Sequence, residues 1–131
     1  MGPGHRAGGS AARRALQASA ALAVLGVLAQ FVTAGHLLST GSWLGAHSVG
    51  ALVLHVLTGL AAAAALWWRL SGGPTWVVVL AAASFALTFP QAASGSYAPL
   101  SVHVPLSLGV AATTVWLLVV AFSPPGGRRA R

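Results

Sequence analysis

Four long runs of apolar residues divide the chain, and short polar segments separate them. The runs contain roughly 18 to 24 residues each, and about 20 helical residues cross the hydrocarbon core of a bilayer. Because a backbone in lipid must satisfy its own hydrogen bonds, helices are favoured, and the alternating pattern of membrane strands is missing. We therefore predict an all-α fold, an integral membrane four-helix bundle running up-down-up-down, with helices over residues 15–38, 45–68, 75–92 and 100–122.

The polar segments set the domain organisation. Residues 1–14 are rich in Gly and Arg and predict a flexible basic cytoplasmic tail, and residues 123–131 predict a second basic tail. The first apolar run exceeds the roughly 7–15 residues of a signal peptide's hydrophobic region, so it is interpreted as a membrane helix. Ser71-Gly72-Gly73-Pro74 separates the second and third helices.

All seven cations are arginines, and their positions predict the topology. They lie before the first helix, at Arg69 between the second and third, and after the fourth, whereas the other two loops carry no Lys or Arg. Four crossings place all seven on one side, which the positive-inside rule makes cytoplasmic. We expect a multi-pass protein of a bacterial plasma membrane with both termini in the cytoplasm. Aromatic belts are expected at the two interfaces, formed by Trp67, Trp68 and Trp76 on one side and Trp43 and Tyr97 on the other.

The composition excludes several classes of function. Charged residues make up 5% of the chain, against about 25% in soluble proteins. The net charge of +7 does not indicate nucleic-acid binding, because the arginines lie at the ends of apolar runs. Asp, Glu and Cys are absent, so no paired carboxylates, acid-oriented Ser–His pair, carboxylate proton relay or thiolate nucleophile can form. The composition favours a protein that is not an enzyme.

The first and second halves of the chain show an internal repeat. The first helix ends in Gln30-Phe31-Val32-Thr33-Ala34-Gly35, and the third in Gln91-Ala92-Ala93-Ser94-Gly95. A polar loop follows each, and then a histidine near the start of the next helix: His47 and His103. This pattern predicts two tandem helical hairpins related by a pseudo-twofold axis along the membrane normal.

His47 and His103 are the leading candidates for chemistry. Both lie roughly one turn into a helix at the same end of the bundle, where two imidazoles could hold one flat macrocycle from both faces. Imidazole is a standard axial haem ligand, and helix bundles build cofactor sites between facing helices. We predict haem b between them, near the outer face. A bare Zn or Cu site made only of imidazoles is the alternative use of these histidines.

The remaining candidates are secondary. His36 is the most loop-like histidine, and interaction with headgroups or a neighbouring helix is the simpler interpretation. His55 lies eight residues after His47, about 12 Å further along the helix and turned by about 80°, so it cannot share the same axial site. Structural packing is favoured for His55, with Gln30 or Gln91 as a hydrogen-bond partner.

Over about residues 15–122 the two-hairpin pattern resembles one half of the haem A synthase family. The resemblance implies a four-helix unit that holds a haem-type ring between a His of its second helix and a His of its fourth, here His47 and His103. It also implies a Gln and a Gly before each His, matched by Gln30 with Gly35 and by Gln91 with Gly95.

The sequence departs from that family in two ways. The synthase's active half carries a Glu shortly before its first ligand, whereas residues 41–46 contain no acid, so we do not expect haem A synthesis. The outer loops offer no cation for haem propionates. Neutral donors would replace it, namely Ser39, Thr40, Ser42, Trp43, Ser96 and Tyr97.

The sequence therefore predicts a haem b-binding membrane protein that transfers electrons, senses redox state or handles haem, with the lipid bilayer as its surroundings. The alternative is a non-catalytic accessory or assembly subunit of a larger membrane complex, or a homo-oligomer. Small residues at Ala46/Gly50 and Gly59/Ala63 would then serve helix contacts within or between chains.

Overall fold

The computed structural model describes residues 3–124, with side chains from residue 8 onward. This part of the chain forms four α-helices and no strand, and each helix is long and apolar enough to cross a membrane. The predicted all-α membrane bundle is confirmed. The helices are α1 (Pro3–Thr40), α2 (Leu44–Leu70), α3 (Thr75–Tyr97) and α4 (Leu100–Phe122).

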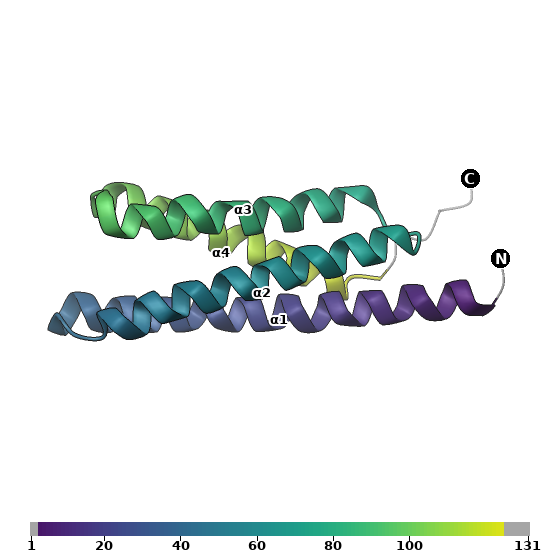
Figure 1. The fold of residues 1–131 in the computed structure, drawn as a ribbon, viewed down its shortest axis with the longest axis horizontal. Coiled ribbons are helices and arrows are strands. Elements are labelled where there is room, and N and C mark those ends of the chain that lie inside the picture. Colours follow the sequence, from purple (N-terminus) through teal and green to yellow (C-terminus); the bar gives the residue numbers. More distant parts are fainter. Residues whose placement is uncertain (1–2, 125–131) are drawn as a thin grey trace.

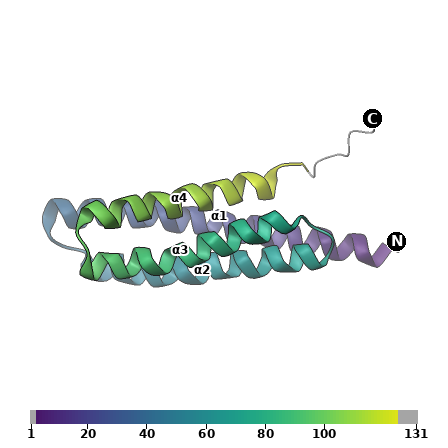
Figure 2. The ribbon, with the colours of Figure 1, turned by 90° about the horizontal axis from the view of Figure 1, so that it is seen from above.

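The four helices run antiparallel and form a square (Figures 1 and 2). The main contacts are α1 with α2, α2 with α3, α3 with α4, and α4 with α1. It follows that α2 and α4 occupy one diagonal of the square. The α1–α2 and α3–α4 loops share one end, here called the histidine end (Figure 1). The α2–α3 loop lies at the opposite end with Arg13, Arg14 and Arg69, here called the arginine end.

The distribution of side-chain sizes is the reverse of that in a soluble protein. Large aliphatic residues such as Leu25, Leu60 and Val79 are exposed on the outside of the bundle. The buried positions are mostly small residues, including hydroxyl residues such as Thr58 and Ser84. Small interior residues let membrane helices approach closely, and lipid accommodates the large apolar exterior.

Close packing is concentrated toward the arginine end. There Leu16, Val77 and Leu117 interlock with a group of buried alanines, Ala20, Ala61, Ala64, Ala65, Ala81 and Ala121. A smaller cluster of Val27, Leu54 and Val110 follows toward the histidine end. Beyond it, the helices enclose open space instead of a third buried cluster of the described residues.

Helix α1 extends further than the sequence predicts. Residues 3–14, expected to form a flexible tail, are helical, so that prediction was wrong for them, whereas residues 1–2 and 125–131 lie outside the described residues. Proline at the first helical position is favourable. The side chains of Ala12 and Leu16 are fully buried, which ties this part of α1 to the bundle.

Polar contacts also hold this segment against α4. The Arg13 guanidinium donates to the carbonyls of Ala121 (3.1 Å) and Ser123, and lies over the Trp68 ring, 5.8 Å from its centre. The Gln17 amide donates to the same Ala121 carbonyl at 3.0 Å. The last carbonyls of a helix have no partner within it, so a cation there is doubly favourable.

Helix α3 ends at Tyr97, five residues beyond the predicted position 92. Pro90 lies inside the helix without ending it. Membrane helices tolerate proline because neighbouring groups satisfy the carbonyl that it leaves free. The extension carries Ser94 and Gly95 into the helical part of the histidine end.

The packing at the arginine end predicts different effects for two neighbouring alanines. Ala81 is fully buried and Ala82 is exposed. We expect Ala81→Leu to lower the free energy of unfolding by about 1–3 kcal/mol, because added methyl groups have no space among the interlocked alanines. Ala82→Leu should leave it nearly unchanged. Denaturant titration in detergent, followed by circular dichroism, measures both, and equal effects would contradict this packing.

Candidate functional site

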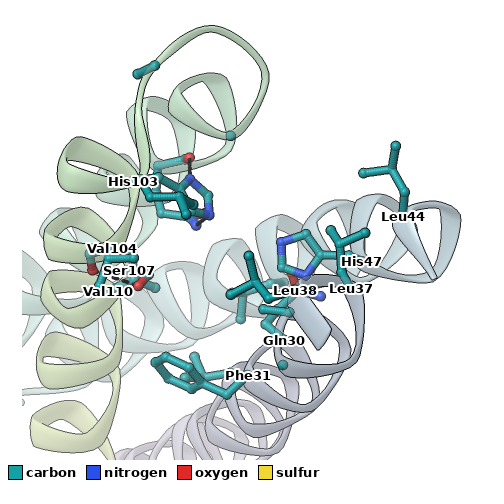
Figure 3. Close-up of a pocket in the computed structure, with 18 residues that line it drawn as sticks. Gln30, Phe31, Leu37, Leu38, Leu44, His47, His103, Val104, Ser107 and Val110 are labelled. Atoms are coloured by element: carbon teal, nitrogen blue, oxygen red, sulfur yellow. Dashed lines mark hydrogen bonds between the residues drawn. The ribbon is translucent and has the colours of Figure 1, made fainter. Parts of the chain in front are cut away.

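His47 of α2 and His103 of α4 face one another across the diagonal of the bundle at the histidine end (Figure 3). Their ring centres lie 6.3 Å apart, and the ring planes are inclined by 65°. The antiparallel order of the helices produces this approach, because each ring follows one of the two loops at this end. Both side chains are half-buried.

Each histidine is held by a hydroxyl group from the preceding helix. The Thr33 hydroxyl lies 3.0 Å from Nδ1 of His47 and donates its proton to the Gln30 carbonyl (3.1 Å). In the second hairpin, the Ser94 hydroxyl lies 3.0 Å from Nδ1 of His103 and donates to the Gln91 carbonyl (2.7 Å). The two hairpins therefore repeat one arrangement of carbonyl, hydroxyl and imidazole.

The hydrogen bonds fix the tautomer of the His103 ring, and the matching arrangement leads us to expect the same tautomer for His47. In the second hairpin the Ser94 hydroxyl gives its one proton to the Gln91 carbonyl, so its oxygen accepts from Nδ1–H of His103. The Gln91 carbonyl, 3.0 Å from Nδ1 of His103, can only accept, which requires the same proton. Nδ1 of His103 therefore carries the hydrogen, and its Nε2 keeps the lone pair that a metal binds.

The Nε2 atoms of the two rings differ in their surroundings. The amide nitrogen of Gln91 lies 3.2 Å from Nε2 of His103 and donates to its lone pair. The equivalent residue of the first hairpin is Gln30. Its side-chain amide packs against Gly50 of α2, where an added Cβ atom would overlap the amide nitrogen. Gly50 is thus a packing position for Gln30.

The space beside the histidine pair is a cavity of about 390 Å³. Its walls come mainly from the outer parts of α1 and α4, and the view in Figure 3 shows Phe31, Leu38, Val104 and Val110 around it. The polar groups in the wall are His47, His103, Gln30, Gln91 and Ser107. This volume lies within the roughly 300–1,000 Å³ of small-molecule sites, which are mostly apolar with a few polar groups.

A second cavity of about 200 Å³ lies against the same two histidines and is otherwise lined by α2 and α3. His55 lines it further along α2. The ring of His55 donates from Nδ1 to the Ala51 carbonyl (2.7 Å) and packs edge-on against Phe89, with ring centres 4.6 Å apart. These contacts are those of a packed structural histidine, and neither Gln30 nor Gln91 is its partner in them.

The other secondary candidates lie outside both cavities. His36 packs against Trp43 with ring centres 4.2 Å apart, and Trp43 has a positive φ of 72° in the α1–α2 loop. Tyr97 is 92% exposed. Among the neutral donors expected for propionates, Thr40 and Ser42 hydrogen-bond to each other at 2.6 Å. The structure therefore groups Gln30 and Gln91 with the histidine pair, but not His36, Trp43 or Tyr97.

The glycines of the repeat do not play matching parts. Gly95 lies against the His103 ring, because a Cβ there would be 3.1 Å from its Cε1 atom, whereas Gly35 has open space beside it. The residues that do match are Thr33 and Ser94, which the sequence interpretation quoted but did not select. Their signal was available: both follow the repeated Gln by three residues.

Among the described residues, the site offers a bare metal ion the two histidines of the pair and no third such ligand. The described residues contain no group of three or more His, Cys, Asp or Glu side chains placed to bind one ion. A structural zinc site needs four protein ligands. Two axial imidazoles, in contrast, are sufficient for a macrocycle that supplies its own equatorial nitrogens.

Comparison with known proteins finds no match: no family model, no curated protein and no solved structure is similar enough to assign the chain to a family.

The hydroxyl contacts predict the proton positions in the unliganded protein. We expect neutral His103 to be the Nδ1–H tautomer, since an Nε2–H ring would set the Nδ1 lone pair against the Gln91 carbonyl oxygen at 3.0 Å, and we expect the same tautomer for His47 from the repeated arrangement. Nitrogen NMR of protein labelled with ¹⁵N-histidine in detergent reads the tautomer directly. The signals that disappear in His47→Asn and in His103→Asn assign the two rings. A dominant Nε2–H form of either ring would refute the arrangement.

Proposed function

We propose that this chain is a haem b-binding membrane protein in which His47 and His103 are the axial ligands. The observation that supports this most directly is the pair of imidazoles facing each other at 6.3 Å, each with Nδ1 beside a hydroxyl of the preceding helix. Metal–imidazole bonds of about 2.0 Å, with about 1.1 Å from nitrogen to ring centre, separate two axial rings by about 6 Å. The observed spacing agrees with that requirement.

The surroundings of the pair also suit a haem. The cavity beside the rings is predominantly apolar, and hydrophobic surroundings are one of the means by which proteins tune bound iron. The hydroxyl groups of Thr33 and Ser94 take the place that carboxylates often have beside metal-binding histidines, orienting each ring through Nδ1. When bound, the haem would supply one-electron chemistry, and the chain's own residues would orient its ligands and exclude water.

The absence of acidic residues limits what the site could do. The whole chain lacks Asp and Glu, so no side chain can act as a carboxylate general acid or base. Electron transfer, redox sensing or storage of haem requires only a bound cofactor in a suitable environment. We therefore assign the protein to that group of functions rather than to haem A synthesis.

The spectrum of the purified protein tests the cofactor. Protein purified in detergent should show a Soret band, and His47→Ala and His103→Ala should lose most of it, with partial recovery on adding free imidazole. His36→Ala and His55→Ala are matched controls that should retain it, because these rings lie outside the facing pair. A colourless protein that co-purifies with a stoichiometric membrane partner would instead support an accessory subunit.

The arginine distribution supports an orientation with the arginine end in the cytoplasm of a bacterial cell. The chain has no cysteine, so single-cysteine variants give a clean test. We expect Ser42→Cys, in the α1–α2 loop, to react with a membrane-impermeant maleimide on intact spheroplasts. Ser71→Cys, in the α2–α3 loop, should react only after permeabilisation. The reverse pattern would invert the topology and place the histidine pair near the cytoplasm.

A further inference from the structure

We propose that Gln91 is a positioning residue whose side-chain amide hydrogen-bonds to Nε2 of His103 in the unliganded protein. As a consequence, His103 is the exchangeable axial ligand and His47 is the permanent one. This inference rests on the proposed haem site. It concerns the order and strength of ligation, which the facing geometry alone does not determine.

Gln91 contacts both nitrogens of the His103 ring. Its backbone carbonyl accepts from Nδ1–H at 3.0 Å, and its side-chain amide donates to Nε2 at 3.2 Å. The same lone pair on Nε2 would bind iron. His103 must therefore give up the Gln91 amide before its Nε2 can become a ligand.

The corresponding amide of the first hairpin is directed elsewhere. Gln30 precedes its hydroxyl partner by three residues, as Gln91 does, yet its side chain lies over Gly50. Gly50 follows His47 by three residues, and the residue three after His103 is Leu106. The two hairpins therefore differ in sequence at the position against which the Gln30 amide packs.

The exchange has two opposite thermodynamic consequences. In the empty protein the amide contact must be broken before ligation, which weakens haem binding. If a small ligand such as carbon monoxide replaced His103 on a bound ferrous haem, the released Nε2 would again accept from the Gln91 amide, which would favour the exchange. A neutral hydrogen bond changes such equilibria by about fivefold.

The test compares Gln91→Leu with Gln30→Leu, the variant of the repeat-equivalent residue. Haem titration of apoprotein should show about fivefold tighter binding for Gln91→Leu and little change for Gln30→Leu. Carbon monoxide titration of the reduced protein should show about fivefold weaker binding for Gln91→Leu. A purely structural role would weaken haem binding, and that result, or equal effects of the two variants, would overturn the proposal.

A measurement without haem separates this inference from the proposed function. In ¹⁵N-histidine spectra of the unliganded protein, Gln91→Leu should shift the Nε2 signal of His103 and leave that of His47 in place. An unshifted signal refutes the Gln91 contact, whatever the protein binds. The opposite combination is also decisive. If Gln91→Leu shifts the Nε2 signal of His103 but the wild-type protein takes up no haem, the haem site and the ligand exchange are overturned, while the placement of Gln91 stands.

Discussion

The structure depends on one constraint: a polar group among apolar helices must find its partner within the chain. Every buried side-chain nitrogen and oxygen atom of the described residues has a hydrogen-bond partner. With Asp and Glu absent, hydroxyls, amides and backbone carbonyls supply these partners, as in the buried Ser84–Thr114 pair between α3 and α4. The same constraint orients the histidines, because only a neighbouring hydroxyl and carbonyl can receive their Nδ1 protons. The chemistry of the site is therefore a consequence of how a chain without carboxylates satisfies imidazoles in a membrane.

The gradient of side-chain size along the bundle explains why the site lies at the histidine end. Alanines bring the helices together toward the arginine end, and Arg13 joins the beginning of α1 to the end of α4. Toward the histidine end, Val27, Leu54 and Val110 are the last buried cluster, and all three also line the larger cavity. The close-packed part thus closes the inner end of the larger cavity. Between this cluster and the loops of the histidine end, the diagonal helices α2 and α4 direct their histidines toward the cavity.

The sequence was sufficient for the architecture because length and hydropathy decide the membrane helices. It was also sufficient to bring His47 and His103 to one end, since hairpin order alone requires this. The parts that it did not predict depend on side-chain detail. Thr33 and Ser94 are ordinary helix residues until one knows that they face an imidazole on the next helix. Gly35 follows Gln30 by five residues, whereas Gly95 follows Gln91 by four, so pairing the two glycines put them one residue out of register. The helical start of α1 was missed because Gly and Arg suggest a tail, whereas the packing of Ala12 and Leu16 decides the outcome.

The two hairpins share a plan but not a symmetric result, and the difference follows from local packing. Both place a hydroxyl of the preceding helix beside Nδ1 of a histidine, and the second hairpin adds the Gln91 carbonyl. The side-chain amides of Gln30 and Gln91 then have to find partners of their own in an apolar interior. The Gln30 amide packs against Gly50 of α2, whereas the Gln91 amide donates to Nε2 of His103. The two histidines therefore share one plan but have different surroundings at Nε2, because their glutamine neighbours are directed differently. Under the proposed function, this difference would make the two axial ligands unequal in strength.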